Sequence, residues 1–322
     1  MLAQAYPGEF EVIVVDDRST DATEKILQTL QRANPDRLKI LRVQDLPEGW
    51  LGKNHTLYLG AKSAQGEWLV FTDADVRFSP LCFEYAINYA SSNGLYHLTL
   101  PPEILSRGLL LRGFVATFTL IFMVTQRPWR ARDPRSREAV GVGAFNLVRR
   151  DAYEKIGTHR AIAMRPDDDM KLAKLVKKHG FRQDVAYGNG LVSVGWHEGL
   201  KGAVRGPGKS MFPGMDYRVD AAILASTLLI ITNVLPFFSI IFSRGPARVI
   251  SAPSVLLTCA MYLFHAIHTK SRTTLWYAAL HPFSVCVFLY AMLNSVITTL
   301  ANDGIDWRGT HYPLANLKWN TV

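Results

Sequence analysis

The stretch FEVIVVDDRSTDA, residues 10–22, decides the fold of this chain. Its first six residues form a short, β-branched apolar run, which is typical of a buried parallel strand, and the run stops at Asp16 and Asp17. A helical pattern over residues 22–33 follows, with Ser19 among the candidate caps. A strand that ends on acidic residues and leads straight into a helix indicates the start of an α/β domain.

The same order of elements recurs further along the chain. The additional elements predicted are strands over 38–43 and 68–72 and helices over 54–64 and 80–91. Strands that alternate with helices predict an α/β layer fold with a mostly parallel sheet. The second of these strands again ends on acidic residues, Asp73 and Asp75. Because ligands of open α/β sheets bind at the carboxyl ends of strands, the acidic strand ends are the first indication of an active site.

The C-terminal part of the chain has a different composition. Of all 322 residues 48% are hydrophobic and the formal net charge is +9, but only six of the 36 Lys and Arg residues lie beyond Asp220. Three uncharged stretches there match the roughly 20 apolar residues that cross a bilayer, namely 221–243, 249–269 and 273–302. We therefore predict a charged domain over 1–218, a membrane domain of about three transmembrane helices over 219–302, and a tail over 303–322.

Other bulk features narrow the class of protein. An apolar stretch over 109–125, interrupted by Arg112 and Gly113, is either a core helix or a helix lying on the membrane surface. Three cysteines are too few for a disulfide framework and show no metal-binding spacing. No nucleic-acid-binding motif accompanies the positive charge, so nucleic acid is not an expected partner. A basic membrane protein that faces the cytoplasm has the same charge balance.

The pair Asp73 and Asp75 is the strongest chemical signal. Two carboxylates separated by one residue, just beyond a strand, can converge on Mg²⁺ or Mn²⁺, which completes its coordination with phosphate oxygens and water. The alternative is a solvated turn. The second acidic strand end, at Asp16 and Asp17, favours the metal site.

A third acidic cluster, Asp167 to Asp169, opens a helix predicted over 170–179. Carboxylates at a helix N-terminus suit the helix dipole, so one of them is explained as a cap. A cap does not explain all three. Adjacent carboxylates repel one another, and we expect the pKa of one of them to be raised.

Taken in order, these motifs resemble a known family. The segments VIVVDDRSTDAT (12–23), GK (52–53), GEWLVFTDADV (66–76) and DDDMKLA (167–173), followed by apolar spans, resemble family 2 glycosyltransferases, whose fold is GT-A. The resemblance covers most of residues 8–218. Within that family the chain is similar to the hopanoid-associated and ceramide-glucosyltransferase-like membrane members, including the closing WRGTHYP over 307–313.

The resemblance implies roles for the residues that match its motifs. In the element formed by Asp16, Asp17 and Ser19, Asp17 would hold the nucleobase or ribose of a sugar nucleotide. Asp73 would lie near the ribose and the sugar, and Asp75 would ligate the metal that bridges the diphosphate. The further residues implied to contact the nucleotide or its diphosphate are Lys53, Arg205 and Lys209.

An inverting transferase also needs a carboxylate to remove the proton of the acceptor hydroxyl. By the same resemblance Asp168 matches a glutamate position and Asp169 the base, and a shift of one residue in the match nominates Asp168 instead. The expected reaction moves a sugar from a UDP-sugar to a hydroxyl of a lipid: a hopanoid, a sphingolipid-like lipid or an isoprenoid. The alternatives are a processive polysaccharide synthase and a catalytically inactive membrane protein.

Two expectations concern the ends of the catalytic domain. Members of the family begin with a further strand and an Asn-Glu loop that contacts the nucleotide. Neither is found before residue 10, so the domain is expected to be N-terminally truncated and to lack its first strand. The cations of residues 201–218 predict that the catalytic domain lies on the cytoplasmic side. The apolar stretches, together with the resemblance to bacterial members of the family, imply a multi-pass protein of the bacterial inner membrane.

Overall fold

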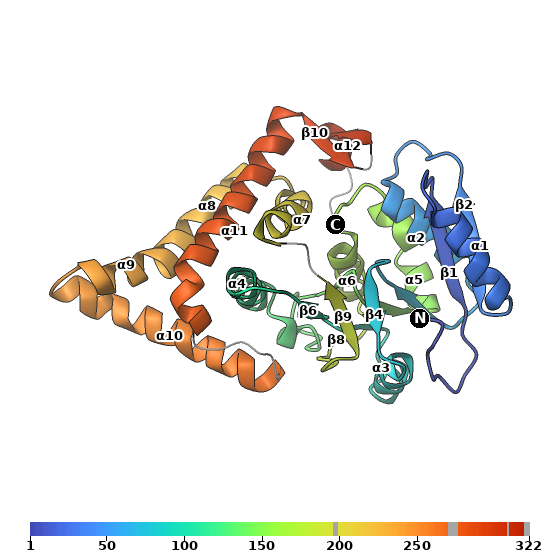
Figure 1. Cartoon of the computed structure of the whole chain (residues 1–322), viewed down its shortest axis with the longest axis horizontal. Coiled ribbons are helices and arrows are strands. Elements are labelled where there is room, and N and C mark those ends of the chain that lie inside the picture. Colours follow the sequence, from blue (N-terminus) through green and yellow to red (C-terminus); the bar gives the residue numbers. More distant parts are fainter. Residues whose placement is uncertain (196–198, 270–275, 308, 319–322) are drawn as a thin grey trace. The chain divides into compact units, whose positions relative to one another are not determined.

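The computed structural model of this chain describes residues 1–195, 199–269, 276–307 and 309–318. The chain divides into two compact units, which we treat separately (Figure 1). The first unit comprises Met1–Glu103 and Pro128–Val194. The second unit comprises Ile104–Arg127 and Gly195–Lys318.

The first unit contains strands that alternate with helices along its N-terminal part, as the sequence predicts. Its elements are β1 (Val12–Asp17), α1 (Thr23–Ala33), β2 (Leu38–Val43), α2 (Gly52–Ser63), β3 (Trp68–Phe71), β4 (Val76–Phe78), α3 (Cys82–Ser92), β5 (His97–Thr99), β6 (Glu103–Leu105), η1 (Pro128–Arg130), β7 (Asn146–Arg149), α5 (Arg150–Lys155), η2 (Thr158–Ile162), α6 (Asp168–Lys178), β8 (Gln183–Val185) and β9 (Val192–Gly195). The α/β class is confirmed.

The sheets of this unit are mixed, which differs from the predicted mostly parallel sheet. Strands β1 and β2 form a parallel pair in which Val12 lies opposite Leu38. A four-stranded sheet has the order β3-β7-β5-β8, and β7 runs antiparallel to both of its neighbours. The chain reaches β7 through a long excursion over residues 106–145 rather than through a single crossover helix, so the rule that makes successive strands parallel does not apply to it.

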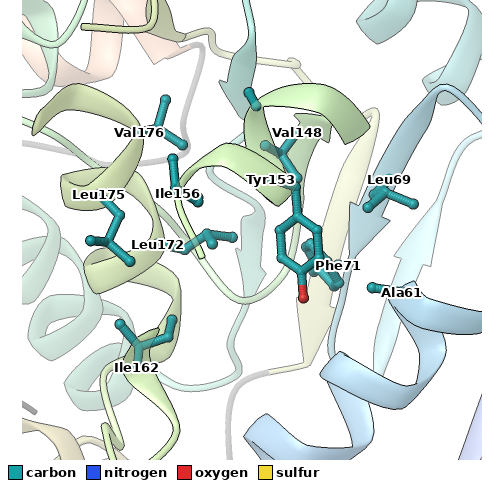
Figure 2. Close-up of a cluster of buried hydrophobic side chains, with 11 residues drawn as sticks. Ala61, Leu69, Phe71, Val148, Tyr153, Ile156, Ile162, Leu172, Leu175 and Val176 are labelled. Carbon is teal, nitrogen blue, oxygen red and sulfur yellow. The ribbon is translucent and has the colours of Figure 1, made fainter. Parts of the chain in front are cut away.

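A core of apolar side chains holds α6 against the four-stranded sheet (Figure 2). On α6, Leu172, Leu175 and Val176 have the i, i+3, i+4 spacing that places them on one helix face. They pack in one cluster with Phe71 of β3 and Val148 of β7. This packing fixes the helix whose first turn carries two aspartates.

A buried amide ties α2 to the segment that leads into α6. The Asn54 side chain, only 1% exposed, donates to the carbonyl oxygens of Ile162, Ala163 and Arg165 at 2.8, 3.1 and 2.8 Å. Because buried carbonyl groups that lose a partner are costly, this contact sets the position of α2 next to α6. The residue before Asn54 is Lys53.

The second unit is mainly helical. Its elements are α4 (Leu109–Gln126), α7 (Gly199–Gly214), α8 (Val219–Leu229), a π-helical turn η3 (Ile230–Val234), α9 (Leu235–Phe242), α10 (Pro246–Thr269), α11 (Trp276–Ala301), β10 (Gly304–Trp307), β11 (Thr310–Pro313) and α12 (Leu314–Lys318). Strands β10 and β11 form an antiparallel hairpin in the segment predicted as a tail.

Four helical stretches are long and apolar enough to cross a membrane, judged by length and composition. They are Leu109–Arg130, Val219–Phe242, Pro246–Ile267 and Trp276–Ala301. The last three correspond to the apolar segments predicted from the sequence. The first contains α4, the stretch for which a core helix and a surface helix were both open.

A chain of polar side chains, three of them buried, connects four of these helical elements. The hydroxyls of Thr117 (α4) and Tyr262 (α10) lie 2.8 Å apart, and the Tyr262 hydroxyl lies 2.9 Å from Nδ1 of His281 (α11). On its other side, Nε2 of His281 lies 3.0 Å from Oδ1 of Asn233 in the π-helical turn. Interhelical hydrogen bonds of this kind stabilise helix association in an apolar environment.

Candidate active site

Lys53 lies where three elements of the first unit meet. Its Nζ atom is 3.1 Å from Oδ1 of Asp73, in the turn after β3, and 3.1 Å from Oδ1 of Asp168, in the first turn of α6. The Asp168 side chain is 5% exposed, that of Lys53 26% and that of Asp73 46%. The structure thus brings together one cation and two carboxylates from distant parts of the sequence. The group is buried at Asp168 and exposed to solvent at Asp73.

The three consecutive aspartates have three different environments. Asp167 accepts two hydrogen bonds from the fully buried Arg165 guanidinium, at 2.9 and 3.1 Å, and makes no side-chain cap to α6. Asp168 pairs with Lys53. Asp169 accepts hydrogen bonds from the backbone N–H groups of Gly143 and Met170, both at 2.7 Å. Asp167 therefore forms an internal ion pair with Arg165, whereas Asp168 and Asp169 lie in the cluster around Lys53.

Sequence reasoning missed the contribution of Gly141 and Gly143, which lead into β7. The carbonyl of Gly143 accepts a hydrogen bond from the Asp73 N–H at 2.9 Å, while its own N–H donates to Asp169. A Cβ atom on Gly143 would lie 2.7 Å from Oδ2 of Asp73, and one on Gly141 would lie 1.9 Å from the Asp169 carbonyl oxygen. The Gly-x-Gly spacing was the available signal, since two glycines allow the backbone to pass this close.

Burial and mutual repulsion change the protonation of this cluster. Burial raises the pKa of Asp168 to about 7; the Lys53 ammonium opposes the rise, and the Asp169 and Asp73 carboxylates add to it. Burial likewise raises the pKa of Asp169. Burial would lower the pKa of Lys53, but the carboxylates of Asp168, Asp73 and Asp169 outweigh it and raise this pKa. The cluster therefore holds a permanent cation beside one carboxyl group, Asp168, whose pKa is about 7, and a second, Asp169, whose pKa is also raised.

The two aspartates at the end of β1 have different surroundings. Asp17 lies against the backbone of Gly52, where a Cβ atom would be 2.6 Å from its Oδ2, so it adjoins the residue before Lys53. Asp16 points elsewhere: its Oδ1 accepts from the Ser19 N–H at 3.1 Å. Asp17 is thus next to the cluster, and Asp16 and Ser19 shape the turn that presents it.

The remaining residues singled out from the sequence are not drawn into the cluster by any described contact. Asp75 is exposed in the turn after Asp73. Among the described residues, no three His, Cys, Asp or Glu side chains are grouped as around a metal ion. Arg205 and Lys209 lie on α7 in the second unit, and their side chains are outside the part of the chain that the structure describes.

Chemically, this site combines three features. It has a carboxyl group of raised pKa, a cation that can neutralise anionic oxygen, and two carboxylates in an exposed turn that suit a divalent cation. These features suit the removal of a proton from a hydroxyl next to a phosphorylated group.

Comparisons with known proteins identify a family that matches the N-terminal half of this chain. Residues 1–157 match the family described as glycosyl transferase family 2. A curated relative, 4,4'-diaponeurosporenoate glycosyltransferase from Staphylococcus haemolyticus, is 26% identical over 220 residues, which cover 63% of this chain and 54% of the relative. This chain thus spans about half the length of the curated relative it matches.

The solved structures that this chain is similar to include two of S. aureus TarS. One covers 91% of this chain and 51% of that chain with a TM-score of 0.45, and the other, residues 1–349 in complex with UDP, covers 96% and 88% with a TM-score of 0.43. Both are 14% identical to this chain.

Proposed function

Because residues 1–157 match glycosyl transferase family 2, we propose that this chain is a membrane-anchored, inverting hexosyltransferase of that family. Its α/β first unit, with mixed sheets, is the GT-A fold expected of that family. The observation that carries the proposal is the convergence of Lys53, Asp73 and Asp168 beside Asp169 within one fold unit.

The proposed donor is a UDP-sugar held at the edge where β1 and β3 end. Asp17, which adjoins Gly52, would contact the nucleoside, and Asp16 and Ser19 would keep its turn in place. Lys53 would bind the diphosphate, because its raised pKa keeps the side chain protonated and the positive charge stabilises the anionic leaving group. For Arg205 and Lys209, a contact with the diphosphate stays a prediction from the sequence.

The donor set also fits a divalent cation. The Lys53 ammonium already lies between two carboxylate oxygens, so the turn after β3 attracts positive charge, and Asp75 is exposed beside it. We assign Asp73 and Asp75 as the residues that would hold Mg²⁺ or Mn²⁺. The bound ion would neutralise charge on the departing diphosphate.

Asp169 is the proposed base. The acceptor hydroxyl oxygen forms a bond to the anomeric carbon of the sugar while the bond from that carbon to the diphosphate breaks, and the hydroxyl proton moves to the Asp169 carboxylate. The backbone donors Gly143 and Met170 hold this carboxylate in place. Its raised pKa supports the assignment, since a base works best when its pKa is close to the working pH.

A lipid acceptor is supported by two observations. The relative from Staphylococcus haemolyticus is named for transfer to 4,4'-diaponeurosporenoate, an isoprenoid-like acceptor. Four helices of this chain are long and apolar enough to cross a membrane. We propose a multi-pass protein of the bacterial plasma membrane whose first unit faces the cytoplasm, where nucleotide sugars are found.

The test uses the full chain in lipid nanodiscs with UDP-hexoses and an isoprenoid alcohol, and measures UDP release and glycolipid formation. Asp169→Asn should abolish transfer and leave UDP binding intact, whereas Asp36→Asn, at an exposed position outside the site, should change neither. Full transfer by Asp169→Asn would place the base elsewhere. Asp75→Ala should remove Mn²⁺-stimulated UDP release, and unchanged release would contradict the metal assignment.

A further inference from the structure

The loop that follows α4 carries a concentration of positive charge. We call residues 128–137 the arginine loop; its ten residues, PWRARDPRSR, contain four arginines and one aspartate, a net charge of +3. Trp129 in this loop is 62% exposed, although large aromatic side chains are usually buried. Neither the charge nor the exposed indole has a role in the proposed transfer reaction.

The arginine loop has a fixed conformation. Ala131 is completely buried, and Pro128 and Ser136 are buried as well. Lys177 of α6 donates hydrogen bonds from its Nζ to the carbonyl oxygens of Ala131 and Asp133, each at 2.6 Å. These buried residues and hydrogen bonds hold the loop in one conformation, so the exposed Trp129 side chain lies on a defined surface of the first unit.

The single acidic side chain of the loop is used internally. Oδ1 of Asp133 accepts a hydrogen bond from the Arg135 N–H at 2.9 Å, which closes the turn. Among the arginines, Arg132 is held by Asn93 at 3.0 Å and by Asp184 at 3.6 Å. The loop carboxylate thus stabilises the backbone and does not shield the other guanidinium groups.

Three guanidinium groups remain for an external partner. Arg130, Arg135 and Arg137 are exposed and, within the described part of the chain, make no side-chain ion pair or hydrogen bond. Guanidinium forks match the oxygens of phosphate groups in a bidentate manner. An exposed indole beside such cations combines an apolar body with a polar N–H, which is the composition of side chains at membrane–water interfaces.

The position of the loop in the chain selects the partner. Trp129 comes three residues after the end of α4, an apolar helix whose preceding and following segments both belong to the first unit. Because those segments lie in one compact unit, such a helix is expected to lie along a membrane surface rather than across the bilayer. Helix α4 also exposes Leu110 and Val124, 50% and 47% respectively. A Trp and arginines just beyond such a helix lie where lipid headgroups are expected.

We propose that the arginine loop is a docking surface for anionic phospholipids. Trp129 inserts at the headgroup level, and Arg130, Arg135 and Arg137 bind lipid phosphate groups. The loop then gives the first unit a contact of its own with the bilayer, in addition to the apolar helices of the second unit. This inference requires only that the chain is embedded in a membrane, and it stands or falls independently of the transfer reaction.

The test follows Trp129 in the full chain, reconstituted into nanodiscs of phosphatidylcholine with or without phosphatidylglycerol. Because the chain has seven tryptophans, the Trp129 signal is taken as the difference between the wild type and Trp129→Phe. Brominated phosphatidylcholine should quench this Trp129 fluorescence, whereas aqueous iodide should not. When phosphatidylglycerol is present, quenching by the brominated lipid should increase and any quenching by iodide should decrease. Quenching of Trp129 by iodide in every lipid mixture would overturn the proposal.

Charge variants separate specific lipid binding from a general effect of net charge. The triple variant Arg130→Ser, Arg135→Ser and Arg137→Ser should lose the dependence on phosphatidylglycerol and on salt. A matched control removes three exposed cations elsewhere on the first unit, at Lys25, Arg32 and Lys62, and should keep that dependence. Equal behaviour of the two triple variants would refute the assignment. Protection of Trp129 by soluble UDP instead of by anionic lipid would also refute it.

Discussion

Replacing Lys53 by Met should destabilise the first unit in a manner that depends on pH. The Lys53 ammonium is 3.1 Å from Asp168, whose side chain is 5% exposed, and burial raises the pKa of that carboxyl to about 7. The protonated acid does not need the ammonium, whereas the ionised form does. The substitution should therefore cost stability only where Asp168 is ionised.

The magnitude follows from proton linkage. The pKa of Asp168 in the folded chain lies above its unfolded value of about 4, so folding takes up a proton and stability declines as the pH rises from about 4 to about 7. In the wild type this decline ends near pH 7, because Lys53 stabilises the carboxylate. Without Lys53 it continues at about 1.4 kcal/mol for each pH unit, which gives about 1.4 kcal/mol at pH 8 and about 2.7 kcal/mol at pH 9.

Asp73 adds little to this value, since its side chain is 46% exposed and solvent screens the second ion pair. The assay is thermal unfolding of the full chain in detergent at pH 6, 8 and 9. A loss of about 1 kcal/mol lowers Tm by about 2–4 °C for a unit of this size. The double variant Lys53→Met with Asp168→Asn removes the ionisable acid, so its difference from the wild type should not grow above pH 7. A Lys53→Met deficit of the same size at pH 6 and pH 9 would refute the reasoning.

Three further outcomes follow from the site and the helices. Gly143→Ala places a methyl group 2.7 Å from Asp73 Oδ2 and should lower turnover of the UDP-sugar at least tenfold with little change in Tm; a wild-type rate would show that the close approach is unimportant. The rate of transfer should fall as the pH decreases through about 7, because Asp168, with a pKa of about 7, takes up a proton there and the pKa of the neighbouring Asp169 is raised as well; a site with ordinary exposed Asp carboxyls would keep its rate down to about pH 4. A flat rate from pH 8 to 5 would contradict this. His281→Ala breaks the polar chain between Tyr262 and Asn233 and should lower the stability of the second unit by about 1–2 kcal/mol, measured as Tm in nanodiscs; Tyr262→Phe should cost no more than His281→Ala.

The sequence predicted much of the architecture because local patterns determine it. The apolar run before Asp16 became β1, and the periodic segment with Ile26 and Leu30 became α1, although α1 buries none of its residues. Two exposed apolar side chains on that helix, 57% and 42%, show that periodicity does not establish what covers a helix face. The direction of β7 was unpredictable for a related reason, since it depends on the path of a long excursion.

The site was predictable in part. The acidic strand ends and the Asp167–Asp169 cluster were visible as composition, but the assignment of one partner to each aspartate depends on tertiary contacts. Arg165 is two residues from Asp167, and its burial could not be read from that spacing. Gly143 reaches Asp169 across 26 residues, so its amide was invisible to any local pattern.

The two-stranded sheet has a consequence for how the first unit moves. Strands β1 and β2 pair only with each other among the described strands, and α1 contributes no buried side chain to hold them. A two-stranded pair is marginally stable alone, so residues 12–43 should open and close more often than the four-stranded sheet. Asp17 sits at the end of this segment. Part of the binding free energy of a nucleotide held there would be used to reduce the opening of these strands. Slower amide hydrogen exchange in residues 12–43 would therefore indicate nucleotide binding before any sugar is transferred.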